Sequence, residues 1–234
     1  IVSGFTKGVT TKVRAMEEML HTQTGKWLAD GSTTGGYTRI PMYGEKVISK
    51  ITPSMNPITE INMKRMLARI DIRNNSATSN FTVEEVYLAN HNTTGYIAPA
   101  WNTNGQVTDP VPDTPVLPAG SGKMTEEGDV IRYSVNGNTP YDGEIYTFES
   151  LAAGDAGGVG QDGEASRKDA TCLIVKGKIG TGELTFYRVD LTNDQTSETM
   201  NILRNHVYRF TVTKVTDDGY DTAELAYKSI PKDI

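Results

Sequence analysis

Alternation of apolar and polar residues is the feature that most constrains how this chain folds. In "MLARIDIR" (66–73), every second residue from Met66 to Ile72 is apolar, and the charged Arg69 and Asp71 stand between them. Side chains that point to opposite faces in turn are typical of an extended strand. The same period recurs in "FTVEEVYLAN" (81–90), "DVIRYSV" (129–135), "IYTFES" (145–150), "TCLIVKGKI" (171–179), "ELTFYRVDL" (183–191) and "HVYRFTVTKV" (206–215). Short strands between turn residues predict an all-β fold, a sandwich or a barrel.

Local signals refine this prediction. The double glutamate Glu84-Glu85 interrupts the alternation of its strand and predicts a β-bulge. The sequence Gly180-Thr181-Gly182 joins two strand segments and predicts a hairpin. Apolar residues at helical spacing predict a short helix in "TTKVRAMEEMLH" (10–21). We also expect one or two helical turns in "TSETMNILRN" (196–205), with Thr196 or Ser197 as the cap.

A proline-rich segment lies in the middle of the chain. Residues 99–123 carry five of the ten prolines. Proline cannot donate a strand hydrogen bond and stiffens the chain, so this segment predicts a domain connection or a long ordered crossing. We therefore expect two β-rich domains, residues 1–115 and 116–234, that meet near residues 100–122.

Composition excludes several classes of function. Lys plus Arg is 23 and Asp plus Glu is 29, which gives a net charge of −6 with no basic run. Nucleic acids and anionic membrane surfaces are recognised by clustered basic residues, so neither is an expected partner. No apolar run is long enough to predict a transmembrane helix. The single cysteine, Cys172, lies in the apolar run "TCLIV" and is expected to be a small buried core residue.

Candidate chemical motifs have simpler structural explanations. "GVGQDG" (158–163) matches G-x-G-x-x-G but lacks the flanking strand and helix that bind a dinucleotide, so we expect a flexible loop. Four acidic residues in the same loop could bind calcium through their carboxylates, although a solvated loop is the better interpretation. These residues are Asp155, Asp162, Glu164 and Asp169. The histidines, His21, His91 and His206, do not have zinc-site spacing. We expect neither a cofactor nor catalysis.

Trp101 is a candidate for contact with a glycan. It lies in the proline-rich segment, where an aromatic side chain could stack on a sugar ring. Aromatic residues of β-sandwiches are more often core or half-buried strand residues. Both interpretations stay open.

Two ordered series of segments carry a family resemblance. The first comprises "IPMYGEKV" (40–47), "MKRMLARIDIRN" (63–74) and "FTVEEVYLANHNTTGYIAP" (81–99). The second comprises "IYTFES" (145–150), "ATCLIVKGKI" (170–179), "LTFYRVDL" (184–191) and "ILRNHVYRFTVTKVTDDGYDT" (202–222). In this order they resemble the two domains of the Bacteroidales fimbrillins, the subunits of type V pili on the outer membrane of that bacterial order.

The resemblance implies two tandem transthyretin-like β-sandwich domains of Greek-key topology with short helices. The first, residues 1–115, would lack its first strands, and the second would span residues 116–234. The resemblance also implies export as a lipoprotein precursor, protease trimming, and a groove that a neighbouring subunit's strand fills by β-augmentation. The partners would be other fimbrial subunits and host glycan or protein receptors, at the surface of a Gram-negative bacterium.

The polar triplet Arg204-Asn205-His206 could be a catalytic cluster or a structural motif. A catalytic base needs an orienting partner and a nucleophile within reach, and the sequence identifies neither. In fimbrillins a similar triplet precedes a core strand, so the resemblance implies a structural motif. That motif comprises Arg204, Asn205, His206, Tyr208 and Phe210.

Two functional hypotheses follow. The first is a non-catalytic structural and adhesive subunit of a bacterial fimbria, in a stalk, tip or anchor position. The second is a glycan-binding, lectin-like module at a fibre tip. Thr222 fits the O-glycosylation triplet of this bacterial order in Asp221-Thr222-Ala223, although an ordinary turn residue is the alternative. The sequence "TAELAYKSIPKDI" (222–234) predicts a brief helix before a proline-broken tail.

Overall fold

The computed structural model describes residues 11–28, 39–48, 60–75, 77–108, 112–119, 130–152, 170–193 and 199–229. The elements in chain order are α1 (Lys12–Glu18), β1 (Leu20–Thr22), β2 (Met42–Tyr43), β3 (Lys64–Arg65), β4 (Ala68–Asn74), β5 (Phe81–Ala89), β6 (Thr94–Tyr96), β7 (Ile131–Ser134), β8 (Tyr141–Thr147), β9 (Cys172–Ile179), β10 (Thr185–Asp190), β11 (Val207–Val212) and α2 (Ala223–Lys228). The fold is predominantly β, as the alternating segments predicted.

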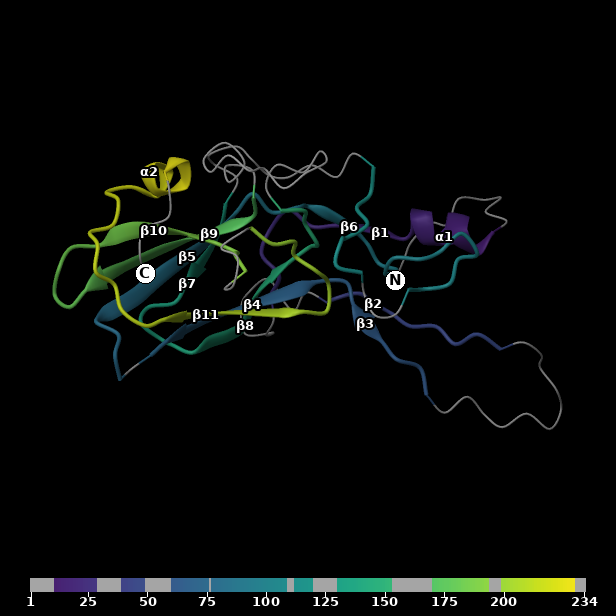
Figure 1. Cartoon of the computed structure of the whole chain (residues 1–234), viewed down its shortest axis with the longest axis horizontal. Coiled ribbons are helices and arrows are strands. Elements are labelled where there is room, and N and C mark those ends of the chain that lie inside the picture. Colours follow the sequence, from purple (N-terminus) through teal and green to yellow (C-terminus); the bar gives the residue numbers. More distant parts are fainter. Residues whose placement is uncertain are drawn as a thin grey trace.

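Two sheets face each other and enclose the main core (Figure 1). The four-stranded sheet has the order β10-β9-β5-β7, and the three-stranded sheet has the order β11-β4-β8. The inward side chains of β4 and β5 are buried between them, for example Ile70, Ile72, Val86 and Leu88. Because alternate residues of a strand share a face, the period of two in the sequence places these side chains together.

This sandwich does not follow the expected division at residue 115. β5 lies between β9 and β7, and β4 lies between β11 and β8. Each sheet therefore joins strands from both sides of the proline-rich segment, and the described strands of 68–89 and 131–212 form one shared sandwich. An alternating pattern predicts a strand but not its partners, which is why the sequence did not disclose this pairing.

A smaller lobe lies at one end of the sandwich, to the right in Figure 1. It contains α1, the β1–β6 ladder and the β2–β3 ladder. Its core comprises Trp27, Met66, Leu67, Ile97 and Phe148. The rings of Trp27 and Phe148 meet edge to face, with centroids 5.8 Å apart, which is a favourable aromatic geometry. Met66 and Leu67 lead into β4 and Phe148 follows β8, so this core continues directly from the sandwich.

Several local predictions are confirmed. The register between β5 and β9 shifts between Val83 and Glu85, which is the bulge that the double glutamate predicted. β9 and β10 form an antiparallel hairpin, and Gly180 in its turn has φ +53°. α1 begins after Thr11, whose side chain accepts the backbone N–H of Arg14 at 3.2 Å. Cys172 is fully buried.

The helical turns expected in residues 196–205 are absent from the part that the structure describes, 199–205. Met200 donates its backbone N–H to Leu191, and Ile202 exchanges two backbone hydrogen bonds with Ser150. Backbone groups that bond to another segment of the chain are not available to a helix. The two expected capping residues lie outside the described residues.

Neither helix of the described segments has the length and apolar character that a membrane span requires. α1 has seven residues and α2 has six. Both helices instead lie against the strands, with Met16 and Ala226 as their buried residues.

Candidate functional site

The three-stranded sheet has two edge strands, β11 and β8, and among the described residues β11 is bonded to a strand on one side. β11 pairs in parallel with β4 along its whole length, from Val207 opposite Arg69 to Val212 opposite Asn74. No second strand pairs with β11 in the part of the chain that the structure describes. An edge strand of this kind presents unpaired N–H and C=O groups that can bind the backbone of another chain.

The register determines which backbone groups of β11 face the open side. The carbonyl groups of His206 and Val212 both accept hydrogen bonds from the β4 side. In a parallel ladder, residues that bond to one neighbour alternate with residues whose groups point away from it. The N–H and C=O groups of Val207, Arg209 and Thr211 therefore face the open edge.

An apolar groove opens beside this edge. Its volume is about 60 Å³, and its lining residues are Ile72, Leu173, Val175, Val189, Phe210, Thr211 and Val212. These residues belong to β4, β9, β10 and β11, so the groove lies between the two sheets. A strand added beside β11 would direct every second side chain toward this groove, because strand side chains alternate.

The edge of the other sheet, formed by β10, is covered. Phe186 exchanges two backbone hydrogen bonds with Tyr220, at 2.9 and 2.8 Å. The hydroxyl group of Tyr187 donates to the carbonyl of Asp217 at 2.9 Å. The segment before α2 therefore occupies part of the edge that β10 would otherwise present to solvent.

α2 covers the outer face of the sheet behind this edge. Arg188 and Asp190 form a buried ion pair at 2.7 Å, and Arg188 donates to the carbonyl of Tyr227 at 2.5 Å. The hydroxyl group of Tyr227 donates to the side chain of Asn90 at 2.7 Å. These contacts bind α2 to the sheet, so that α2 and the segment before it together cover β10.

Arg204, which precedes β11, is buried and fully engaged. Its Nε donates to Glu149 at 2.7 Å, and its backbone N–H donates to the same carboxylate at 3.2 Å. Its Nη1 and Nη2 donate to the carbonyl groups of Ile97 and Tyr96 at 3.0 and 2.8 Å. One side chain thus joins the start of β11 to the end of β8 and to the smaller lobe.

Asn205 and His206 complete this connection through their backbones. Asn205 has φ +59°, a left-handed conformation that asparagine tolerates better than most residues. Its N–H donates to the carbonyl of Leu67 at 2.9 Å, and its side-chain oxygen accepts the N–H of Arg65 at 3.4 Å. His206 Nδ1 lies 2.8 Å from the carbonyl oxygen of Arg204. These contacts of the triplet therefore hold backbone segments of β11, β4 and the smaller lobe in place.

Tyr208 and Phe210 lie on the inward side of β11. Both are partly buried and contact the main core. The hydroxyl of Tyr208 accepts the N–H of Leu203 at 2.8 Å and donates to the carbonyl of Asn201 at 3.1 Å. Burial raises the pKa of Tyr208, which keeps this hydroxyl protonated as a donor. Phe210 also lines the groove, so it links the core to the open edge.

The outward side of the same sheet is charged. Asp71 of β4 has a side chain that is 0% exposed, and it accepts Arg69 at 2.9 Å and the N–H of Gly143 at 3.0 Å. Arg73 binds Asp142 of β8 at 2.6 Å. Hydrogen bonding to Arg73 is the main cause that lowers the pKa of Asp142 below its usual value. These pairs cover the middle of the sheet with alternating charge.

Trp101 lies away from the open edge. It is partly exposed, and its ring meets Tyr96 edge to face, with ring centroids 5.1 Å apart.

A polar hollow of about 270 Å³ lies beside the loop that carries Trp101; it is lined by Tyr43, Gly44, Glu45, Lys46, Val47, Glu60, Asn62, Lys64, Pro99 and Val107. Glu45 accepts hydrogen bonds from Lys12 at 2.6 Å, Tyr43 at 2.8 Å and the Val107 N–H at 3.0 Å. Burial acts to raise the pKa of Glu45, but these donors lower it overall.

The remaining candidates contribute no described residue to this edge. Thr222 caps α2, and its side-chain oxygen accepts the N–H of Leu225 at 3.2 Å. The glycine-rich loop and its acidic group, at 155–169, lie outside the described residues. Within the described ranges no group of three or more His, Cys, Asp or Glu residues is placed to hold a metal ion.

Sequence reasoning missed two features of this site. The partner of Arg204, Glu149, is 55 residues away in the chain, and the segment that covers β10 is more than 30 residues from Phe186. Neither separation has a local signal. Asp71 could have been noticed, because a carboxylate between Arg69 and Arg73 on a strand predicts an ion-pair row on one face.

The comparisons with known proteins give no family. No protein-family model and no curated protein matches the chain. Among solved structures, a candidate cell adhesion protein of Parabacteroides distasonis is similar at 19% identity and a TM-score of 0.33. The match covers 64% of this chain and 44% of that chain. A likeness at this level does not bear on the fold or the function of this protein.

Proposed function

We propose that this protein is a structural and adhesive subunit of a bacterial surface fimbria, without catalytic activity, which assembles by β-strand insertion between subunits. The observation that carries the proposal is the open edge of β11 beside the apolar groove. Its partners are other fimbrial subunits, and its location is the outer surface of a Gram-negative bacterium after export as a lipoprotein precursor. This matches the resemblance to the fimbrillins in residues 40–99 and 145–222.

The edge and the groove support this proposal together. An added strand would receive main-chain hydrogen bonds from Val207, Arg209 and Thr211, and the groove would receive its alternate side chains. Val207 of β11 has 49% of its surface exposed, so an added strand could cover part of this side chain. Burial of this side chain and of the groove lining would provide the apolar part of the binding free energy.

A proline at Thr211 tests the proposal. The N–H of Thr211 faces the open edge, so proline there removes a donor for an added strand without removing a bond to β4. We expect Thr211→Pro to fold and reach the cell surface but to be missing from sheared fibres, as measured by immunoelectron microscopy and immunoblotting of the fibre fraction.

Thr211→Val is the matched control, because it keeps the N–H and favours a strand. It should be found in fibres at the wild-type level. Tyr208→Pro should instead unfold the protein, because that N–H bonds to β4. Incorporation of Thr211→Pro at the wild-type level would exclude strand addition at β11.

A glycan-binding module is a second candidate, and the polar hollow beside the Trp101 loop favours it. Carboxylate, amide and ammonium groups around a concave site can bind sugar hydroxyls, and a neighbouring aromatic ring can stack on the sugar. A glycan array probed with wild type and Trp101→Ala tests this function. Identical array profiles for the two proteins would remove Trp101 from it.

A further inference from the structure

The outer face of the three-stranded sheet has an uneven distribution of charge. Asp142 and Glu144 lie on β8, whereas Arg209 lies on β11 at the opposite side of the sheet. Arg69 and Arg73 lie on β4 between them. The basic end of this face is therefore the open edge, although the chain as a whole has a net charge of −6.

Arg209 is the arginine with the weakest ion pair on this face. Arg69 contacts Asp71 at 2.9 Å and Arg73 contacts Asp142 at 2.6 Å. Among the described residues, Arg209 forms an ion pair with Asp71 at 3.8 Å and shares that carboxylate with Arg69. Its side chain is 48% exposed. The guanidinium group of Arg209 thus retains donors for a further anionic partner.

A strand added beside β11 would place one residue directly next to Arg209. Residues opposite each other on paired strands point to the same face of the sheet. The neighbour of Arg209 would therefore lie on the outer, charged face, and the residues before and after it would point toward the groove. One residue of the partner would therefore contact the charge of Arg209, and the residues on either side of it would pack into the apolar groove.

We propose that the open edge of β11 selects a partner strand that carries a carboxylate opposite Arg209 and apolar residues on either side of it. This inference rests on the strand addition proposed above. The partner is an extended segment of a neighbouring subunit with the alternation apolar–acidic–apolar. A lysine or arginine at the central position would meet Arg209 as a like charge and be rejected.

Fluorescent peptides with one alternating valine and threonine pattern test this selection. The central outward residue is Glu, Gln or Lys, and binding to the full chain is measured by fluorescence anisotropy. We expect wild type to bind the Glu peptide about 3- to 10-fold more tightly than the Lys peptide. The preference should shrink in 1 M salt, because exposed ion pairs are screened.

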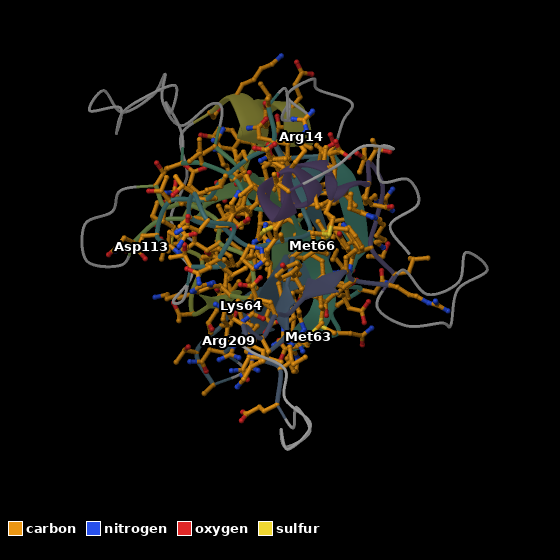
Figure 2. All side chains as sticks on the ribbon, turned by 90° about the vertical axis from the view of Figure 1, so that its right-hand side faces the viewer. Arg14, Met63, Lys64, Met66, Asp113 and Arg209 are labelled. Carbon is orange, nitrogen blue, oxygen red and sulfur yellow. The ribbon has the colours of Figure 1, made fainter. Side chains whose placement is uncertain are left out.

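Three variants give the inference its controls. Arg209→Gln should bind the Glu and Lys peptides with similar affinity, and Arg209→Glu should prefer the Lys peptide. If repulsion from Asp71 unfolds Arg209→Glu in thermal melts, Arg209→Gln alone decides the result. Arg14→Glu is a matched exposed-arginine control and should keep the wild-type preference. Figure 2 shows Arg14 near the top of the molecule and Arg209 in its lower part.

The outcomes separate this inference from the proposed function. Equal binding of all three peptides to wild type, with loss of binding in Thr211→Pro, would overturn charge selection but leave strand addition in place. Binding that survives in Thr211→Pro, or no binding of any peptide to wild type, would overturn strand addition and charge selection together.

Discussion

The two sheet edges β10 and β11 lie on the same side of the sandwich and differ in how they are protected. β10 has Tyr220 bonded to its edge and α2 packed behind it. β11 has β4 on one side and no strand of the described residues on the other. Both edge strands contribute residues to the same groove. The edge on the β10 side of this groove is therefore covered, whereas the edge on the β11 side is bonded to no further strand of the described residues.

This difference distinguishes β11 from β10 at the groove that they share. An unprotected edge is an aggregation risk that proteins normally cover or charge. This chain covers β10 with a segment close to its C-terminal helix, and it places the charged Arg209 on β11. A protein that covers one edge and leaves the adjacent edge with an apolar groove has a surface suited to a strand partner.

The largest expected effect concerns the anchor at the start of β11. Arg204→Met leaves the buried Glu149 without its cation, and the free energy of unfolding should fall by about 3–5 kcal/mol. Denaturant titration followed by tryptophan fluorescence measures this change. The double variant Arg204→Met/Glu149→Leu should recover much of the loss, and an equal loss in both would contradict the ion-pair explanation.

A smaller effect should follow from a change in the cover over β10. A Cβ atom at Gly219 would lie 2.6 Å from Thr185 Oγ1 and 2.8 Å from Tyr187 Cε2. Gly219→Ala should therefore displace the segment that ends in Tyr220 and lower the free energy of unfolding by about 1–3 kcal/mol. Faster hydrogen exchange at Phe186 is the specific measurement. Gly25→Ala is the control, because no atom lies within 4 Å of its added Cβ.

The hydrogen bond between α2 and the sheet should contribute less. Tyr227→Phe removes the donor to Asn90, and we expect a loss of about 1 kcal/mol in denaturant titration. Peptide binding at β11 should not change, because Tyr227 does not line the groove beside β11. A loss of peptide binding in Tyr227→Phe would show that the edges are coupled.

The smallest effect concerns the charged face beside β11. The pKa of Asp142 is lowered in the folded protein by Arg73, so its contribution is present above its unfolded pKa and is lost as the pH falls through the folded value. Asp142 is partly exposed, so the contribution is at most about 0.5 kcal/mol. Thermal melts between pH 7 and pH 2 should show a slightly weaker acid dependence for Asp142→Asn than for wild type. The same pH dependence of thermal stability in Asp142→Asn and wild type would mean that the Arg73–Asp142 pair does not contribute to stability.

The sequence predicted strands well and their partners poorly. The alternation around Ile70 and Phe210 identified β4 and β11, and the double glutamate located the bulge in β5. No local pattern indicated that β4 and β11, about 140 residues apart, would pair in parallel. Pairing over such a separation depends on the packing of the whole core, which short-range patterns do not encode.

For the candidate site, the sequence drew attention to residues in and before β11 but indicated neither their contacts nor the groove. The resemblance singled out Arg204, Asn205 and His206, and the structure places them at the turn into the open edge strand. Their partners, such as Glu149 and the carbonyl of Ile97, come from other parts of the chain. The edge position of β11 itself could not be predicted, because it depends on how distant strands are ordered in the sheet.

The parallel pairing of β11 with β4 has a mechanical consequence. A partner strand that is pulled along the axis of β11 would load the hydrogen bonds between β11 and β4 in shear, so that they resist together instead of opening one at a time. Arg204 connects the start of β11 to carbonyl groups of the smaller lobe. Tension on that strand would therefore spread into both parts of the molecule.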